Sequence, residues 1–368
     1  MKTLKLLFHI LFILANIVVV ILFILSALSD EIPPTDALFF AYLGLAFPIF
    51  FVLTLCFILY WIFRRKWKYA LLGLCALVLC KDQVKNYFPI HKKVKETELR
   101  KDDLKVLTYN VMGFGYRNHT KTAPNRILEY IARSGADIVC LQEYAASKSE
   151  KLLTDQKIFD ALAMYPYHSV IPFGTSGQMK FGIAVFSKYP ITGSRRIQYK
   201  SNFNGSSLHE IEVKGKKLVL INNHLESFKL TSEDRSRYSA FIKNLNADTF
   251  DGLRSAFEQK LGPAFRIRAA QAEAVAKEIK QIKAPYLVVC GDFNDTPVSY
   301  AHKTIQGPLT DAYAASGKGP GVTYNQNFFW FRIDNIMHSP NIKPMNCTVE
   351  KVRYSDHYPM WCYLRLTE

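Results

Sequence analysis

The chain has 368 residues, 49% of them hydrophobic, and carries a formal net charge of +16 at pH 7. This length exceeds that of most single domains, so we expect one sizeable globular core and a further segment. The basic residues are spread along the chain, which argues against a dedicated nucleic-acid-binding stripe and is compatible with anionic lipid or phosphate. The seven cysteines show no paired spacing, so the sequence indicates neither a zinc site nor a disulfide framework.

Two long and almost uninterrupted apolar runs open the chain, at residues 4–28 and 38–63. Each has about the length that crosses a bilayer as a helix. The first run starts beside Lys2 and Lys5, as a signal peptide would, but it is too long for a signal peptide and ends in a weak cleavage site. We therefore expect a retained anchor.

Charged residues around these runs indicate their orientation. The segment between the runs, SDEIPPTD, is acidic and contains prolines, whereas RRKWK at residues 64–68 is strongly basic. Because basic residues tend to stay on the cytoplasmic side, we place the N-terminus and Arg64 in the cytoplasm.

A third apolar run, residues 69–80, decides on which side the rest of the chain lies. Its roughly twelve residues cover only about 18 Å as a helix, against a hydrocarbon core about 30 Å thick. If the run crosses by extending toward Ile90, the remainder is extracytoplasmic; if it is re-entrant, the remainder is cytoplasmic, as the basic stretch after it favours. We favour the crossing, because RRKWK marks the start of one. Residues 1–90 are thus expected to form the two or three transmembrane helices of a multi-pass inner-membrane protein.

The remaining chain has the patterns of a mixed α/β domain. Residues 91–103 are charged and lack apolar periodicity, which is typical of a linker. Helical patterns fall at residues 124–134 and 264–282. The runs predicted as strands are residues 104–110, 136–143, 181–188, 208–224 (a hairpin turning at Lys214 and Gly215), 286–292, 332–339 and 358–366. Several strands are too apolar to have a solvent-exposed face, so we expect sheets that are covered on both sides.

Two segments allow both a functional and a structural interpretation. Residues 229–262 are polar and charged, and they form either a lid over a site or a surface insertion, which is the interpretation we favour. The aromatic run NFFWF at residues 327–331 could stack on a ligand, but just before a strand it is more typical of packing.

Polar residues suited to catalysis end or border most of the apolar runs. One such residue says little, because strands must end and loops are polar, but a whole set in one domain indicates a site held at strand ends. Carboxylates and amides suit a hard cation such as Mg²⁺ rather than zinc, and histidines can handle protons. No glycine-rich nucleotide-binding motif and no serine-hydrolase motif is present in the sequence. The set consists of Asn110, Glu143, His224, Asp292, Asn294, Asp334, Asp356 and His357.

Seven motifs in this region carry a family resemblance: LTYNVMGF, DIVCLQEY, GIAVFSKYPI, INNHLES, GDFNDTP, RIDNI and YSDHYP. In this order they resemble the endonuclease/exonuclease/phosphatase family, which includes deoxyribonucleases, sphingomyelinases and inositol polyphosphate phosphatases. The resemblance covers about residues 104–366, so we expect a catalytic domain at residues 104–368. It implies an α/β fold of the α+β type: a four-layered α/β/β/α sandwich with two mixed sheets packed face to face.

The resemblance also implies roles for individual residues. Glu143 matches the principal metal ligand, with Asn110 beside it and Asp356 as a further ligand. Asp292 matches the residue that orients or deprotonates the attacking water, and Asn294 matches the amide that holds phosphate or water.

Two histidines complete the implied site. Asp334 matches the partner that orients His357, which would stabilise charge on the phosphoryl oxygens. His224 matches the histidine that assists the leaving group in the deoxyribonuclease, sphingomyelinase and phosphatase branches. Its presence argues against an abasic-site endonuclease. The implied cofactor is Mg²⁺, with Mn²⁺ as an alternative.

The sequence therefore predicts a membrane-anchored, Mg²⁺-dependent phosphoesterase that hydrolyses a phosphodiester or phosphomonoester by in-line attack of water. Its expected partners are the lipid bilayer and a phosphate ester of a lipid or small molecule rather than of nucleic acid, because no interleaving of aromatic and basic residues marks a nucleic-acid groove. A metal-dependent nuclease stays open as the alternative. A catalytically inactive membrane scaffold is less favoured, because every expected site residue is present.

Overall fold

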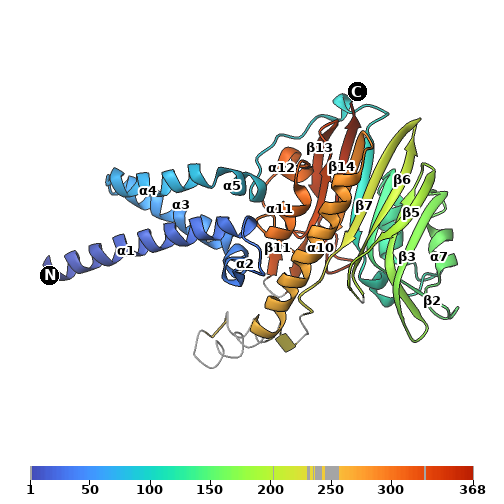
Figure 1. Cartoon of the computed structure of the whole chain (residues 1–368), viewed down its shortest axis with the longest axis horizontal. Coiled ribbons are helices and arrows are strands. Elements are labelled where there is room, and N and C mark those ends of the chain that lie inside the picture. Colours follow the sequence, from blue (N-terminus) through green and yellow to red (C-terminus); the bar gives the residue numbers. More distant parts are fainter. Residues whose placement is uncertain are drawn as a thin grey trace.

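The computed structural model describes residues 2–367 except 202, 230–232, 235, 237–242, 245–256 and 327–328. In this part of the chain, a bundle of apolar helices projects from a domain built on two six-stranded sheets (Figure 1). The sheets pack face to face around one apolar core, and two further cores lie between the sheets and the outer helices. The predicted α/β/β/α sandwich is confirmed.

The first sheet has the strand order β13-β14-β1-β2-β4-β3. β1 (Leu104–Asn110) is parallel to β2 (Ile138–Ser147) and antiparallel to β14 (Met360–Leu366). Val106 of β1 belongs to the core between the sheets, whereas Leu107 belongs to the core under the outer helices, so both faces of the strand are buried. The other strands of this sheet are β3 (Tyr167–Ser176), β4 (Met179–Ser187) and β13 (Ile342–Val349).

The second sheet has the strand order β5-β6-β7-β8-β12-β9. β7 (Lys216–His224) is parallel to β8 (Tyr286–Asp292), and β12 (Asp334–His338) is antiparallel to β8. β6 (Gly205–Val213) and β7 form the predicted hairpin, in which Lys214 and Gly215 have the positive φ of a two-residue turn, 51° and 78°. The remaining strands are β5 (Ile191–Ile197), β9 (Thr310–Asp311) and the separate pair β10 (Tyr324–Gln326) and β11 (Phe329–Phe331).

Helices cover the outer faces of both sheets. α6 (Arg126–Arg133) and α7 (Asp155–Ala161) pack on the first sheet, and α10 (Gly262–Gln281) and α11 (Tyr300–Gln306) pack on the second. A short helix, α12 (Ala312–Ser316), adds Ala312 and Tyr313 to the core between the sheets.

The strands that the sequence patterns do not predict are β3, β5 and β13, together with the short β9, β10 and β11. β3, β5 and β13 lie at edges of the two large sheets. An edge strand is covered less than a central one, so it lacks the continuous apolar run, and β3 and β13 also contain Pro172 and Pro344.

The projecting bundle contains α1 (Lys2–Ala27), α3 (Phe47–Phe63) and α4 (Trp67–Leu79) (Figure 1). Within the described residues, only the helical stretch Thr3–Asp30 is by itself long and apolar enough to cross a membrane. The second apolar run is not the continuous helix we expect from its length, because α2 (Leu38–Leu45) meets α3 at a bend of 60°. Pro48 in the first turn of α3 has no N–H to donate and disfavours helical geometry before it.

The third apolar run is also shorter than a complete span. α4 has 13 residues, and after Cys80 a polar helix, α5 (Lys81–Tyr87), leads toward the domain. The segment expected as a linker then follows the sheet edge, where the backbone N–H of Val94 donates to the Asn346 side chain (2.7 Å). Arg365 of β14 pairs with Asp103 at 2.6 Å.

The bundle and the domain pack directly on one another. The Ser29 hydroxyl donates to the backbone carbonyl of Val298 (2.7 Å), in the segment between β8 and α11. Lys303 of α11 lies 3.0 Å from the Glu31 carboxylate. Val298 also shares an apolar cluster with Phe23 of α1 and Phe47 of α3. The helical bundle therefore has a defined orientation on the domain.

Candidate active site

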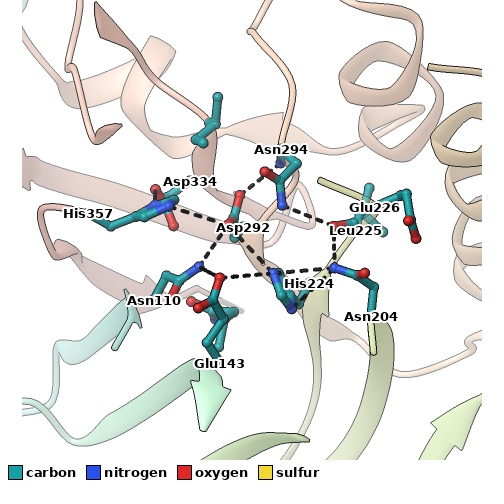
Figure 2. A network of polar contacts seen from close by, with 12 residues as sticks. Asn110, Glu143, Asn204, His224, Leu225, Glu226, Asp292, Asn294, Asp334 and His357 are labelled. Carbon is teal, nitrogen blue, oxygen red and sulfur yellow. Dashed lines mark hydrogen bonds and ion pairs between the residues drawn. The ribbon is translucent and has the colours of Figure 1, made fainter. Parts of the chain in front are cut away.

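The strand ends singled out in the sequence meet at one edge of the two sheets. His224, the last residue of β7, pairs in register with Asp292, the last residue of the parallel β8. Asp334 opens the antiparallel β12 and pairs with Asp292 from the other side. The topology of the second sheet alone therefore gathers three of the predicted residues. The structure brings Asn110, Glu143, Asn294 and His357 to the same place (Figure 2). Asp356, the fifth, lines the same pocket.

Asn110 connects the two sheets within the site. Its side-chain amide donates to Glu143 (3.1 Å) and to Asp292 (3.0 Å), and its carbonyl oxygen accepts from the backbone N–H of Met112 (3.1 Å). Ser355 donates to the backbone carbonyl of Asn110 (2.8 Å), which ties the segment before Asp356 and His357 to the end of β1. Sequence reasoning did not identify this role of Ser355.

Glu143 reaches the site through an irregularity in β2. The register between β2 and β4 shifts between Leu141 and Tyr144, and Glu143 has a φ of 51°. A bulge of this kind re-aims a side chain that regular alternation would direct elsewhere. The Glu143 side chain remains 39% exposed. Because most of the side chain is nevertheless enclosed by protein, partial burial raises its pKa, as does the nearby Asp356 carboxylate, although the hydrogen bond from Asn110 opposes this.

Asp292 is almost fully buried at the end of β8, and its carboxylate is held by two donors. The backbone N–H of Asn294 donates to one oxygen (2.8 Å) and Asn110 to the other. Burial raises the pKa of Asp292 to about 6, against the opposing effect of His357. Gly291, with a φ of 123°, permits the close approach of β7, because a Cβ there would lie 2.1 Å from the Asn223 carbonyl oxygen.

The chain after Asp292 is not extended. Asn294 has a φ of 52°, and its side-chain amide donates to the backbone carbonyl of Leu225 (3.0 Å). Asp292 and Asn294 thus line one pocket through a turn rather than through the alternation of an extended strand. Phe293, between them, is fully buried in the core under α10 and α11.

Asp334 and His357 form a buried pair. The Asp334 carboxylate lies 2.8 Å from Nδ1 of His357, and Nε2 of the same ring lies 3.7 Å from Asp292. Burial alone would lower the pKa of His357, but the Asp334 and Asp292 carboxylates raise it well above its usual value. The two carboxylates therefore favour the protonated form of His357.

His224 lies on the opposite side of Asp292 (Figure 2). Its Nε2 is 3.6 Å from Glu143 and 3.9 Å from Asp292. Burial lowers its pKa, which favours the neutral imidazole. Asn204 donates to the backbone carbonyl of Leu225 (2.9 Å) and lies 3.4 Å from the His224 ring. No signal in the sequence identifies Asn204, because it precedes β6 in a loop without apolar periodicity.

A pocket of about 320 Å³ opens over these groups and is lined by Glu143, Asp292, Asn294, Asp356 and His357. A second hollow of about 370 Å³ adjoins it past Glu143 and is lined by His224 and Asn204. The site is thus open on both sides of Glu143. The segment 229–262 lies largely outside the described residues, as do residues 327–328 of the aromatic run.

The residues present fit a divalent cation. Four carboxylates gather around two histidines, and one oxygen of Asp334 is buried without a hydrogen-bond partner. Asp292, Asp334 and His357 each offer an atom within 4.8 Å of the others, although the hydrogen bond between Asp334 and His357 already occupies one nitrogen of that ring. Glu143 and Asp356 face the pocket with oxygen donors that hard cations prefer. The carboxylate oxygens of Glu143 and Asp356, and the negative charge of these two groups, favour binding of the ion on the side of the pocket that Glu143 lines.

Comparison with known families agrees with this geometry. The endonuclease/exonuclease/phosphatase family matches residues 107–357. A second family, described as a domain of unknown function (DUF8431), matches residues 8–87.

One curated relative and two solved structures illustrate the likeness. A "Putative neutral sphingomyelinase" of Drosophila melanogaster is 32% identical over 162 residues, which are 40% of this chain and only 35% of that protein. The human Nocturnin catalytic domain with bound sulfate anion has 19% identity and a TM-score of 0.51 over 73% of this chain and 95% of that chain. A protein of the same family from Leptotrichia buccalis has 15% identity and a TM-score of 0.50 over 71% of this chain and 99% of that chain. At these identities the two structures share the fold.

Proposed function

Because the chain belongs to the endonuclease/exonuclease/phosphatase family, whose members are phosphoester hydrolases, we propose that it is a membrane-anchored phosphoesterase. It would hydrolyse a phosphodiester or phosphomonoester by metal-assisted, in-line attack of water. The observation that carries the proposal is the buried Asp292 carboxylate, held by Asn110 and Asn294 and flanked by two histidines of opposite protonation behaviour.

Asp292 has the properties of a general base. Its pKa of about 6 lies close to neutral pH, where a base is both ionised and able to take a proton. The two hydrogen bonds fix its carboxylate at the floor of the pocket. A water molecule between Asp292 and a bound phosphate would lose its proton to this carboxylate.

Glu143 and Asp356, with Asn110 beside them, would hold Mg²⁺, and Mn²⁺ accepts the same oxygen ligands. When bound, the ion neutralises negative charge on the phosphoryl group. His357 adds a second positive charge, because Asp334 holds its Nδ1 and leaves Nε2 to donate toward a phosphoryl oxygen. The neutral His224 can donate a hydrogen bond to the departing oxygen from the opposite side.

The substrate would be a phosphate ester of a lipid or small molecule. The likeness to a relative named as a neutral sphingomyelinase supports a lipid, although the match covers about a third of that protein. A metal-dependent nuclease is the alternative, and the net charge of +16 is the observation that favours it. An inactive scaffold is disfavoured, because the proposed base, metal ligands and histidines are present and mutually oriented.

The anchor would cross the membrane with α1, α3 and α4 and hold the catalytic domain on the extracytoplasmic side. Trp61 of α3 packs on His9 of α1 and Tyr69 of α4, with ring centroids 5.7 and 4.7 Å apart, so the three helices meet near the basic Arg64. Their opposite ends meet at Val298 of the domain. If the basic end is cytoplasmic, the domain lies across the bilayer from it.

The activity is tested with the full-length protein in detergent micelles, Mg²⁺ and bis-p-nitrophenyl phosphate. Asp292→Asn keeps the shape of the base but removes its proton affinity, so we expect turnover to fall by about 10²- to 10⁴-fold. Chelation with EDTA should abolish turnover and added Mg²⁺ should restore it. Asp160→Asn makes the same substitution at an exposed position of α7 and should leave turnover unchanged.

Equal turnover by Asp292→Asn and the unmodified protein would contradict the assignment of the base. Plasmid DNA cleavage, measured beside headgroup release from liposomes, separates the nuclease from the lipid phosphoesterase. Absence of turnover with all three substrates would favour the scaffold.

A further inference from the structure

The pocket over Asp292 has an apolar wall, and part of that wall belongs to the membrane segment. Leu45, the last residue of α2, lines the same pocket as Glu143 and His357. Leu261 and Phe331 extend the apolar lining beside it. A charged phosphate and an apolar group could therefore occupy this one cavity together.

α2 is held in place by contacts with the catalytic domain. The Tyr42 ring meets Phe265 of α10 edge to face, with ring centroids 5.8 Å apart. Gly262, at the start of α10, approaches α2 so closely that a Cβ there would lie 2.9 Å from the Leu38 side chain. Phe265 in turn packs on Phe228, another lining residue of the pocket, at 5.1 Å.

A second contact fixes the end of α2 next to the catalytic loop. A Cβ on Gly44 would lie 2.3 Å from the Ser29 hydroxyl and 3.0 Å from the Val298 carbonyl oxygen. Val298 follows Asp292 and Asn294 in the same loop. This packing leaves no space for a larger residue at position 44, so the adjacent Leu45 has a defined position at the pocket.

The bend between α2 and α3 determines how the pocket would lie relative to the bilayer. When α3 crosses a membrane, a bend of 60° directs α2 away from the bilayer normal, toward the membrane surface. α2 has no charged residue, and Phe39 on it is 58% exposed. A helix that is apolar all round is suited to the acyl-chain region beneath the headgroups, where it would contact the chains of membrane lipids.

From these contacts we infer that α2 of the membrane segment is part of the substrate site. Leu45, with Leu261 and Phe331, takes the apolar groups next to the phosphate of a membrane lipid, while Glu143, Asp292 and His357 face that phosphate. The inference rests on the proposed phosphoesterase function and narrows its substrates to lipid phosphoesters that enter from the bilayer. In the reaction, water gives a proton to Asp292 and adds to phosphorus, the P–O ester bond breaks, and the departing oxygen takes up a proton from solvent; Asp292 then returns its proton to solvent.

The test compares two kinds of substrate for the full-length protein reconstituted in phosphatidylcholine vesicles with Mg²⁺. The lipid probes are sphingomyelin, phosphatidic acid and phosphatidylinositol 4-phosphate, each in a separate preparation, and the soluble probe is bis-p-nitrophenyl phosphate. Leu45→Asn should lower the ratio of kcat/KM for the lipid to kcat/KM for the soluble ester by about tenfold, because one apolar contact to the lipid is lost. This factor corresponds to about 1.4 kcal/mol.

Two further variants separate substrate contact from a general effect on the fold. Leu45→Met keeps an apolar side chain of similar size and should restore the ratio to within about twofold. Leu59→Asn makes the polar substitution at a position of α3 that is 67% exposed and away from the pocket lining, and it should leave the ratio unchanged.

The possible results have different meanings. An unchanged ratio in Leu45→Asn, or an equal loss of kcat/KM with both kinds of substrate, would overturn the inference that α2 is part of the substrate site. If the unmodified protein hydrolyses the soluble ester but none of the lipids, the inference is wrong and the phosphoesterase proposal stands. If it hydrolyses neither, both are wrong.

Discussion

Glu143 and Asn294 both have a positive φ, 51° and 52°, and both line the catalytic pocket. For a residue such as glutamate this conformation costs about 1–2 kcal/mol, whereas asparagine adopts it more readily. Two hydrogen bonds hold Asn294 in it: its backbone N–H donates to Asp292 and its side chain donates to Leu225. Single residues in this site are thus positioned by strained backbone that the surrounding contacts stabilise.

A buried histidine remote from the site allows a prediction about pH and stability. His209 of β6 lies 2.7 Å from the Ser207 hydroxyl and 2.9 Å from the Ser194 hydroxyl, and burial lowers its pKa from 6.5 to about 4. The unfolded chain binds this proton more readily than the folded one, so the stabilisation is complete above about pH 6.5 and is lost as the pH falls toward 4. The loss should reach about 3 kcal/mol, from a shift of about 2.5 pH units at 1.36 kcal/mol each.

Urea unfolding of the full chain in detergent, followed by tryptophan fluorescence between pH 7 and 4, measures this loss. His209→Gln should flatten the pH dependence, whereas His168→Gln, at an exposed position of β3, should not. Identical slopes for His209→Gln and the unmodified protein would show that other groups cause the acid sensitivity.

At the scale of elements, α10 holds the two loops that border the pocket. Arg268 of α10 is fully buried; its guanidinium pairs with Asp295 at 2.6 Å and donates to the backbone carbonyl of Glu226 at 3.0 Å. The same group stacks on Phe228, 4.5 Å from the ring centre. One buried side chain thus joins the loop after β7 to the loop after β8.

Removing the positive charge of Arg268 alone should destabilise the domain more than removing the charges of both Arg268 and Asp295. Arg268→Met leaves the Asp295 carboxylate buried and unpaired, and we expect a loss of about 3–5 kcal/mol in the free energy of unfolding. Combining it with Asp295→Asn should recover part of that loss, because no buried charge then remains uncompensated. Urea unfolding of the two single variants and the double variant measures the coupling. If the losses in the free energy of unfolding of the two single variants add up to that of the double variant, the predicted coupling is absent.

At the scale of the whole molecule, the apolar helical bundle and the domain form one packed unit. The bundle that projects in Figure 1 reaches the domain through Ser29, Phe47 and Tyr87, and Ser29 hydrogen-bonds to the carbonyl of Val298. Because this contact surface holds the domain in one orientation, the pocket has a defined relation to any membrane that the bundle crosses.

The proposed orientation predicts where the domain lies in a cell. Alkaline phosphatase, which is active only outside the cytoplasm, should be active when fused after residue 100 and inactive when fused after residue 66, between α3 and α4. A fluorescent protein that matures only in the cytoplasm should show the reverse pattern. A silent phosphatase after residue 100 would place the domain in the cytoplasm and exclude a third crossing.

Much of the fold can be read from the sequence, because its central strands are buried on both faces. β1 and β8 begin and end at the predicted residues, and the hairpin turns at Lys214 and Gly215. The edge strands β3, β5 and β13 escape prediction because partial exposure removes the apolar pattern. The run at residues 38–63 has the composition of one span, but a proline and a bend divide it.

The sequence by itself determined which residue types end the strands, since the polar residues Asn110, His224 and Asp292 stand at the ends of runs that begin as apolar strands. Only the tertiary structure decided which of these groups touch. The contact of Asn110 with Asp292 joins residues 182 positions apart, and the pocket joins Leu45 to His357. Such contacts depend on how the two sheets pack and how the helical bundle packs on the domain, and local patterns of hydrophobicity do not encode that long-range geometry.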